Sequence, residues 1–139
     1  DAARRTGLPV VVCMVFDSGR DKDRTMMGDT PEQVGAALAR EGADVVGANC
    51  GQGIEAFPAI CGRLRAASDR PLWLKPNAGR PRVLDGKVHY DASPERFAEA
   101  IPELLRLGAS FIGGCCGTTP EFIRAAAAKV GAARTGQRT

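Results

Sequence analysis

The stretch SFIGGCCGTTPE, residues 110–121, contains a short apolar run, a glycine-rich turn with two adjacent cysteines, and a helix start. The helix start is predicted by Thr119-Pro120-Glu121, because a hydroxyl caps the first turn, proline fits its backbone and glutamate suits the positive end of a helix. The same signature recurs at Thr30-Pro31-Glu32 and Ser93-Pro94-Glu95. This repetition predicts a chain built from repeated strand–turn–helix units.

Four apolar runs, each followed by a helical pattern, are the candidate strands. They are continuously apolar rather than alternating, which is typical of parallel strands buried on both faces. The runs are residues 8–16, 43–49, 72–75 and 110–113. A full (β/α)8 barrel takes about 250 residues and eight units, so four consecutive βα units predict an α/β fold that is half of such a barrel. A small doubly wound sheet is the alternative architecture.

Other segments set the expected boundaries. Residues 1–7 are typical of the tail of a preceding helix, whose own strand is missing, so we expect an incomplete domain. The half-barrel is expected over residues 8–130, and a flexible tail over residues 131–139. Within the third unit, residues 83–88 predict a small β-hairpin that turns on Asp85-Gly86.

The composition is that of an ordinary soluble domain. Of the 139 residues, 44% are hydrophobic and 25% charged, and the formal charge of +3 comes largely from scattered arginines. This balance does not indicate nucleic-acid binding. No stretch approaches the roughly 20 apolar residues needed to cross a bilayer, and no signal peptide is apparent. We therefore expect a cytoplasmic protein with no membrane partner.

The cysteines carry the candidate chemistry. Five cysteines in this spacing are unlike a disulfide framework, so reduced thiols are expected. Cys50 closes one strand run, and Cys115 and Cys116 follow another, so all three are expected at the same edge of a parallel sheet. Three thiolates suit zinc and leave one position open, which favours binding and ionising a thiol substrate for S-alkylation. Cys13 and Cys61 are interpreted as packing residues.

Three motifs resemble the homocysteine S-methyltransferase family. They are GANC at 47–50, PNAG at 76–79 and GGCCGTTP at 113–120, within a match over about residues 8–127. Within this family, residues 16–20 and 28–31 also resemble the loop after the fifth strand in the zinc- and homocysteine-binding barrel of cobalamin-dependent methionine synthases. The resemblance implies that the four strands are the fifth to eighth, the C-terminal half, of the barrel.

The resemblance also implies roles for individual residues. Cys50, Cys115 and Cys116 would bind zinc, and the homocysteine sulfur would take the open position and receive a methyl group, giving methionine. No catalytic residue beyond the zinc ligands is expected. The candidates for substrate binding are Asn49, Asn77 and Thr118. The asparagines serve equally well as turn residues, and the helix start at Thr118 is also explained by plain capping.

The methyl donor and the partners stay open. Methylcobalamin, a betaine or S-methylmethionine would each deliver a methyl group to the same sulfur, and the resemblance favours a corrinoid or folate-linked donor. The expected partners are homocysteine, the donor, and either the missing N-terminal half-barrel or a second copy of the chain. One rival hypothesis is a non-catalytic zinc-binding half that only assembles with a partner. Another is an α/β module with incidental cysteines.

Overall fold

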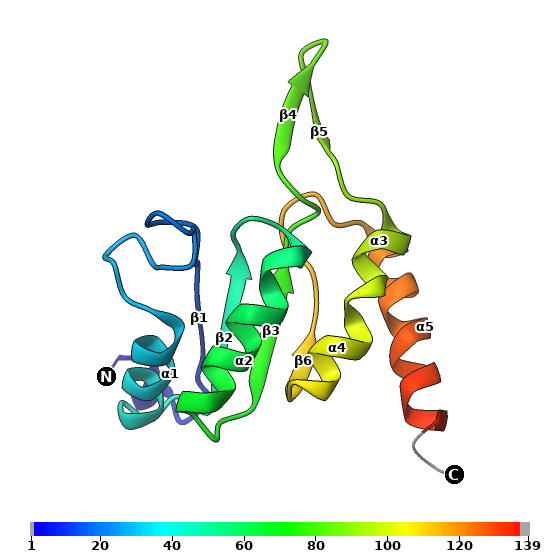
Figure 1. The fold of residues 1–139 in the computed structure, drawn as a ribbon. Helices are drawn as coiled ribbons and strands as arrows, with labels where there is room; N and C mark the ends of the chain where they lie inside the picture. The colour runs from blue at the N-terminus through cyan, green and yellow to red at the C-terminus, as the bar shows by residue number, and fades with distance from the viewer. Residues whose placement is uncertain (1, 137–139) are drawn as a thin grey trace.

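The structure, a computed structural model, describes residues 2–136, and its centre is a four-stranded parallel sheet (Figure 1). The strands lie in the order β1 (Val11–Met14), β2 (Val45–Cys50), β3 (Leu72–Pro76) and β6 (Ala109–Ile112). Parallel pairing of the four apolar runs is therefore confirmed. Spatial order follows chain order without the reversal that defines a doubly wound sheet, so the alternative architecture is disfavoured.

The helices follow the strands along the chain. They are α1 (Pro31–Arg40), α2 (Phe57–Ala67), α3 (Pro94–Glu99), α4 (Ile101–Arg106) and α5 (Pro120–Gly136), with short 3-10 helices η1 (Ala3–Thr6) and η2 (Ile54–Ala56). The predicted caps are present: Thr30 and Gln33 form a reciprocal capping box, and the Ser93 hydroxyl accepts a hydrogen bond from the Arg96 amide. These local interactions explain why α1 and α3 begin at the repeated motif. Helix α5 also begins at the motif, where the Thr119 hydroxyl donates to the Glu121 carboxylate.

Two helical segments differ in detail from the sequence pattern. The third helical segment is divided at Ala100, because Pro102 has no amide hydrogen to donate to the preceding turn. Helix α5 continues to Gly136, six residues beyond the boundary expected at 130, and residues 137–139 lie outside the described residues. The division of the chain into domains stays a prediction.

The core lies between the sheet and the helices. Along β3, Leu72, Leu74 and Pro76 are buried, whereas the alternate residues Trp73 and Lys75 are half-buried. The main apolar contributors are Val46, Ala48, Leu72, Leu74, Phe57, Ile60, Leu64, Phe97, Ile101, Leu104, Phe122 and Ala126. One face of the sheet is therefore covered by helices. Burial on both faces was expected, but the second face is open in this chain.

The predicted hairpin is confirmed as β4 (Pro81–Leu84) paired antiparallel with β5 (Lys87–Tyr90). Both turn residues, Asp85 and Gly86, have positive φ angles, of 50° and 72°, as a type I′ turn requires. The hairpin projects well beyond the end of the sheet (Figure 1).

None of the helices within residues 2–136 combines the length and the apolar character needed to span a membrane. The expected cytoplasmic location stays a prediction.

Gly47, in the middle of β2, provides a test of the packing. A Cβ atom there would overlap the Trp73 carbonyl group and approach the Cys13 Sγ to 2.9 Å. Gly47→Ala should therefore lower the free energy of unfolding by about 1–3 kcal/mol in urea titrations. Gly131→Ala is the control, because its Cβ would meet nothing within 4 Å and a helical alanine gains about 0.5–1 kcal/mol over glycine. Equal unfolding midpoints for the two variants would contradict this packing.

Candidate metal centre

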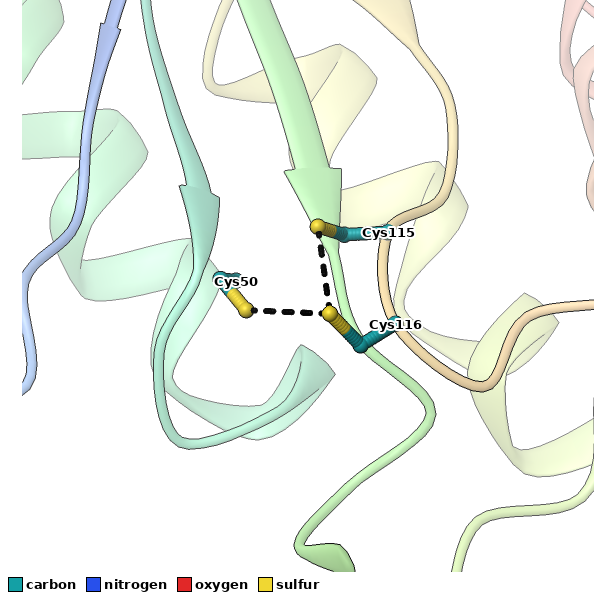
Figure 2. Close-up of side chains that lie close together, drawn as sticks. All are labelled: Cys50, Cys115 and Cys116. Atoms are coloured by element: carbon teal, nitrogen blue, oxygen red, sulfur yellow. Dashed lines mark hydrogen bonds between the residues drawn. The ribbon is translucent and has the colours of Figure 1, made fainter.

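The structure brings Cys50, Cys115 and Cys116 together (Figure 2). The Sγ atoms of Cys50 and Cys116 are 3.6 Å apart, those of Cys115 and Cys116 are 3.9 Å apart, and all three lie within 4.8 Å of one another. Cys50 ends β2, and the pair follows β6, so the cluster lies at the carboxyl ends of parallel strands. Cys13 and Cys61 lie outside it, and both Sγ atoms are directed at backbone carbonyls.

The backbone at Cys50 is unusual. Its φ angle is 60°, in the left-handed region that non-glycine residues rarely adopt, and Gly51 follows with a φ angle of 75°. Such a conformation costs about 1–3 kcal/mol and persists only where surrounding contacts impose it. The turn directs the Cys50 side chain toward Cys116 (Figure 2).

The turn that carries the cysteine pair is held by hydrogen bonds to the segment after β3. The Cys115 amide donates to the Pro76 carbonyl, and the Ala78 amide donates to the Cys116 carbonyl, each at 2.9 Å. The Thr118 hydroxyl donates to the Cys115 carbonyl at 2.7 Å. Thr118 was predicted to bind substrate, and in the structure its proton is engaged in holding this turn.

Asn77 lies beside the cluster and is 4% exposed. Its Nδ2 donates to the Gly51 carbonyl at 3.0 Å and lies 4.0 Å from the Cys50 Sγ. Its Oδ1 is buried and has no hydrogen-bond partner within the part of the chain that the structure describes. A buried acceptor without a donor costs about 1–3 kcal/mol, so this oxygen is a candidate to bind a group absent from the protein itself.

The thiols differ in acidity. Burial, together with hydrogen bonds with the Cys116 and Cys115 thiols, raises the pKa of Cys50 to about 11. Burial also acts to raise the pKa of Cys115, but hydrogen bonds from the Cys116 backbone and from the side chains of Cys116, Cys50 and Asn49 outweigh it, so this pKa is lowered. Asn49 therefore acts on the cluster, by favouring the thiolate of Cys115.

The cluster fits a zinc ion. Tetrahedral zinc with Zn–S distances of about 2.3 Å places its sulfurs about 3.8 Å apart. Two of the three Sγ separations, 3.6 and 3.9 Å, agree with that spacing, and the third is within 4.8 Å. Three soft sulfur donors form a set that suits zinc and that leaves the fourth position of a tetrahedral site open.

A polar pocket of about 300 Å³ was not found by sequence reasoning. It is lined by Gln52, Glu55, Gly79, Arg80, Asp91, Ala92 and Arg96. Arg96 is paired with Glu55 at 2.8 Å, and the Arg80 guanidinium contacts Gln52. The only sequence signal for this pocket is that several of these residues closely follow the ends of β2 and β3.

Comparison with known proteins assigns the chain to a family. A family model described as homocysteine S-methyltransferase matches residues 1–130. The methionine synthases of Mycobacterium leprae (strain TN) and Mycobacterium tuberculosis (strain ATCC 25618 / H37Rv) are 40% and 39% identical over 103 residues, or 70% of this chain. The chain spans 8% and 9% of the lengths of these two relatives, respectively.

Solved structures agree with this result. The oxidized form of the homocysteine methyltransferase MmuM from Escherichia coli superposes with a TM-score of 0.59 at 30% identity, covering 79% of this chain and 33% of that one. The apo form gives a TM-score of 0.60 at 28% identity, covering 81% and 36%. The parallel sheet with helices on one face is consistent with part of a TIM-barrel-like domain. By its sequence and its fold, the chain belongs to the homocysteine S-methyltransferase family.

Proposed function

We propose that this chain is the zinc-binding C-terminal half, strands 5–8, of a (β/α)8 barrel that transfers a methyl group to homocysteine and forms methionine. The observation that carries the proposal is the convergence of three thiols within 4.8 Å at the carboxyl ends of parallel strands. Barrel enzymes build their sites at that end. Family membership supports the reaction class.

Cys50, Cys115 and Cys116 are the proposed zinc ligands. The strained turn at Cys50 and the hydrogen bonds at Cys115 and Cys116 hold the thiols close together. Such preorganisation lowers the ordering cost of binding. Bound zinc would act as a Lewis acid that lowers the pKa of the homocysteine thiol, so that its sulfur attacks the methyl carbon as a thiolate.

The three predicted substrate-binding residues have different support. Asn77 has the most direct support, because its Nδ2 lies 4.0 Å from the Cys50 Sγ and its buried Oδ1 lacks a partner in the described structure. The Asn49 side chain forms a hydrogen bond with Cys115. It would bind substrate only through the amide N–H and oxygen lone pairs that this bond leaves free. Thr118 donates its proton to the Cys115 carbonyl, so only its oxygen lone pairs remain for a ligand.

The sequence resemblance favours methylcobalamin as the methyl donor. The chain's own residues would bind the metal and orient the acceptor sulfur, and no general acid or base is required for an in-line transfer between carbon and sulfur. In that transfer, the new bond forms between the homocysteine sulfur and the methyl carbon while the bond from that carbon to the donor breaks.

The open edges support the proposed need for further strands. An apolar groove of about 370 Å³ lies between β6 and α5, and a smaller one of about 160 Å³ lies between β1 and α1. Trp73 and Phe111, with ring centroids 5.7 Å apart, lie on the open face of the sheet. A missing N-terminal half-barrel or a second copy would cover these surfaces.

We expect the reduced chain by itself to self-associate, because its open edge strands and apolar grooves remain uncovered. Light scattering should give a mass above that of one chain, and this mass should rise with protein concentration. A stable monomer at all concentrations would contradict the half-barrel interpretation.

Replacing any of the three proposed ligands should remove zinc. Cys50→Ala, Cys115→Ala and Cys116→Ala should each weaken zinc binding by more than the roughly 10–100-fold that loss of a supporting outer residue costs. Metal analysis after dialysis against a competing chelator measures this loss. Cys13→Ala and Cys61→Ala are matched controls that should keep the metal. Equal losses in all five variants would refute the ligand assignment.

X-ray absorption at the zinc edge tests the role of the open position. The zinc-loaded, reduced protein should show three sulfurs and one lighter atom, and the lighter atom should be replaced by a fourth sulfur when homocysteine is added. A site that homocysteine leaves unchanged would favour the non-catalytic assembly role. A protein that binds no zinc would contradict the proposed function of this chain.

A further inference from the structure

Tyr90, the last residue of β5, connects the projecting hairpin to the cysteine turn. Its ring lies against Gly117, the residue directly after Cys116, so closely that a Cβ atom at Gly117 would overlap the ring. Gly117 has a φ angle of 77°, which favours glycine on its own account. The Tyr90 ring therefore occupies the space that a side chain at Gly117 would need, although the two residues are 27 positions apart in the chain.

Backbone hydrogen bonds link the same two segments. The Ala92 amide donates to the Ala78 carbonyl at 3.0 Å, and the Ala78 amide donates to the Cys116 carbonyl at 2.9 Å. The base of the hairpin is thus joined through Ala78 to the residue whose Sγ lies 3.6 Å from that of Cys50. The contact of Tyr90 with Gly117 supplies a second link to the same turn.

Tyr90 differs from the rest of the hairpin. Cross-strand pairs place Pro81 beside Tyr90 and Val83 beside Val88, so these four residues lie on one face of the hairpin. Val83 is 71% exposed and Val88 is 60% exposed. Among the residues of β4 and β5, Tyr90 alone is partly buried and packed against the core. Its ring is therefore the apolar anchor of the hairpin.

We propose that Tyr90 is a positioning residue for the cysteine cluster: its ring holds Gly117 and keeps Cys116 beside Cys50. The metal-binding measurement described below rests on the proposed function, whereas the role of Tyr90 in positioning Cys116 does not. This contact couples the position of the hairpin to the spacing of the thiols. A hairpin base that is less firmly held should therefore let Cys116 move away from Cys50.

The test compares Tyr90→Ala and Tyr90→Leu with Tyr90→Phe in the full chain. Both non-aromatic variants lose the flat ring, and Tyr90→Leu keeps apolar bulk if Tyr90→Ala fails to fold. Tyr90→Phe keeps the ring and should behave as the wild type. Val83→Ala, at an exposed position on the same face of the hairpin, is the control for a general change in the hairpin.

The first measurement needs no metal. In glutathione redox buffers, oxidised glutathione accepts two electrons from the Cys50 and Cys116 thiols, which form a disulfide and leave two molecules of reduced glutathione. Peptide mapping gives the equilibrium constant, which reports how closely the two thiols are held. We expect a decrease of about tenfold for Tyr90→Ala and Tyr90→Leu, and no change for Tyr90→Phe or Val83→Ala. Unchanged constants in all four folded variants would overturn the proposal.

The second measurement is a cobalt(II) titration followed by the thiolate-to-metal absorption band. We expect the dissociation constant of the two non-aromatic variants to rise about tenfold, as is usual for loss of an outer residue that orients a ligand. Tyr90→Phe should restore wild-type affinity and band intensity. A wild-type protein that binds no cobalt would refute the proposed metal site, and the disulfide equilibrium would still decide the role of Tyr90.

Discussion

The parallel register around β3 is the constraint on which the rest of the site depends. Strand β2 pairs with β3 on one side, placing Cys50 opposite Pro76. On the other side, the chain leaving β6 continues the contact, because the Cys115 amide donates to the Pro76 carbonyl. Pro76 thus lies between the two cysteine segments. Because parallel strands end at the same edge, the Sγ atoms of residues 65 positions apart in sequence come within 4.8 Å of each other.

Backbone conformation and hydrogen bonds hold the cysteine turns in place. Cys50 adopts a left-handed conformation, and the turn after β6 is closed by the Thr118 hydroxyl and the Ala78 amide. Strain of this kind is supported by the well-packed core beneath the sheet, where Leu72 and Leu74 are fully buried. The thiols therefore lie at zinc-like spacing while one buried acceptor, the Asn77 Oδ1, stays without a partner in the described structure.

The sheet is covered by helices on one face and open on the other. The open face carries Trp73, Phe111 and Lys75, with the Lys75 ammonium 5.0 Å from the centre of the Trp73 ring. Large apolar groups on an exposed sheet face favour a further protein layer. This arrangement agrees with the superposition on MmuM from E. coli, in which this chain covers 33% of that structure.

Sequence analysis predicted the four parallel strands, the helix starts at Pro31, Pro94 and Pro120, the hairpin and the three candidate ligands. These features depend on local patterns: apolar runs, capping residues within one turn, and Asp85-Gly86 at a tight turn. Only the tertiary structure decided that one sheet face is open, that the Asn77 oxygen lacks a partner in the described part, and that Tyr90 lies on Gly117. The physical reason is that burial and side-chain contacts depend on segments far apart in the chain, about which local patterns carry no information.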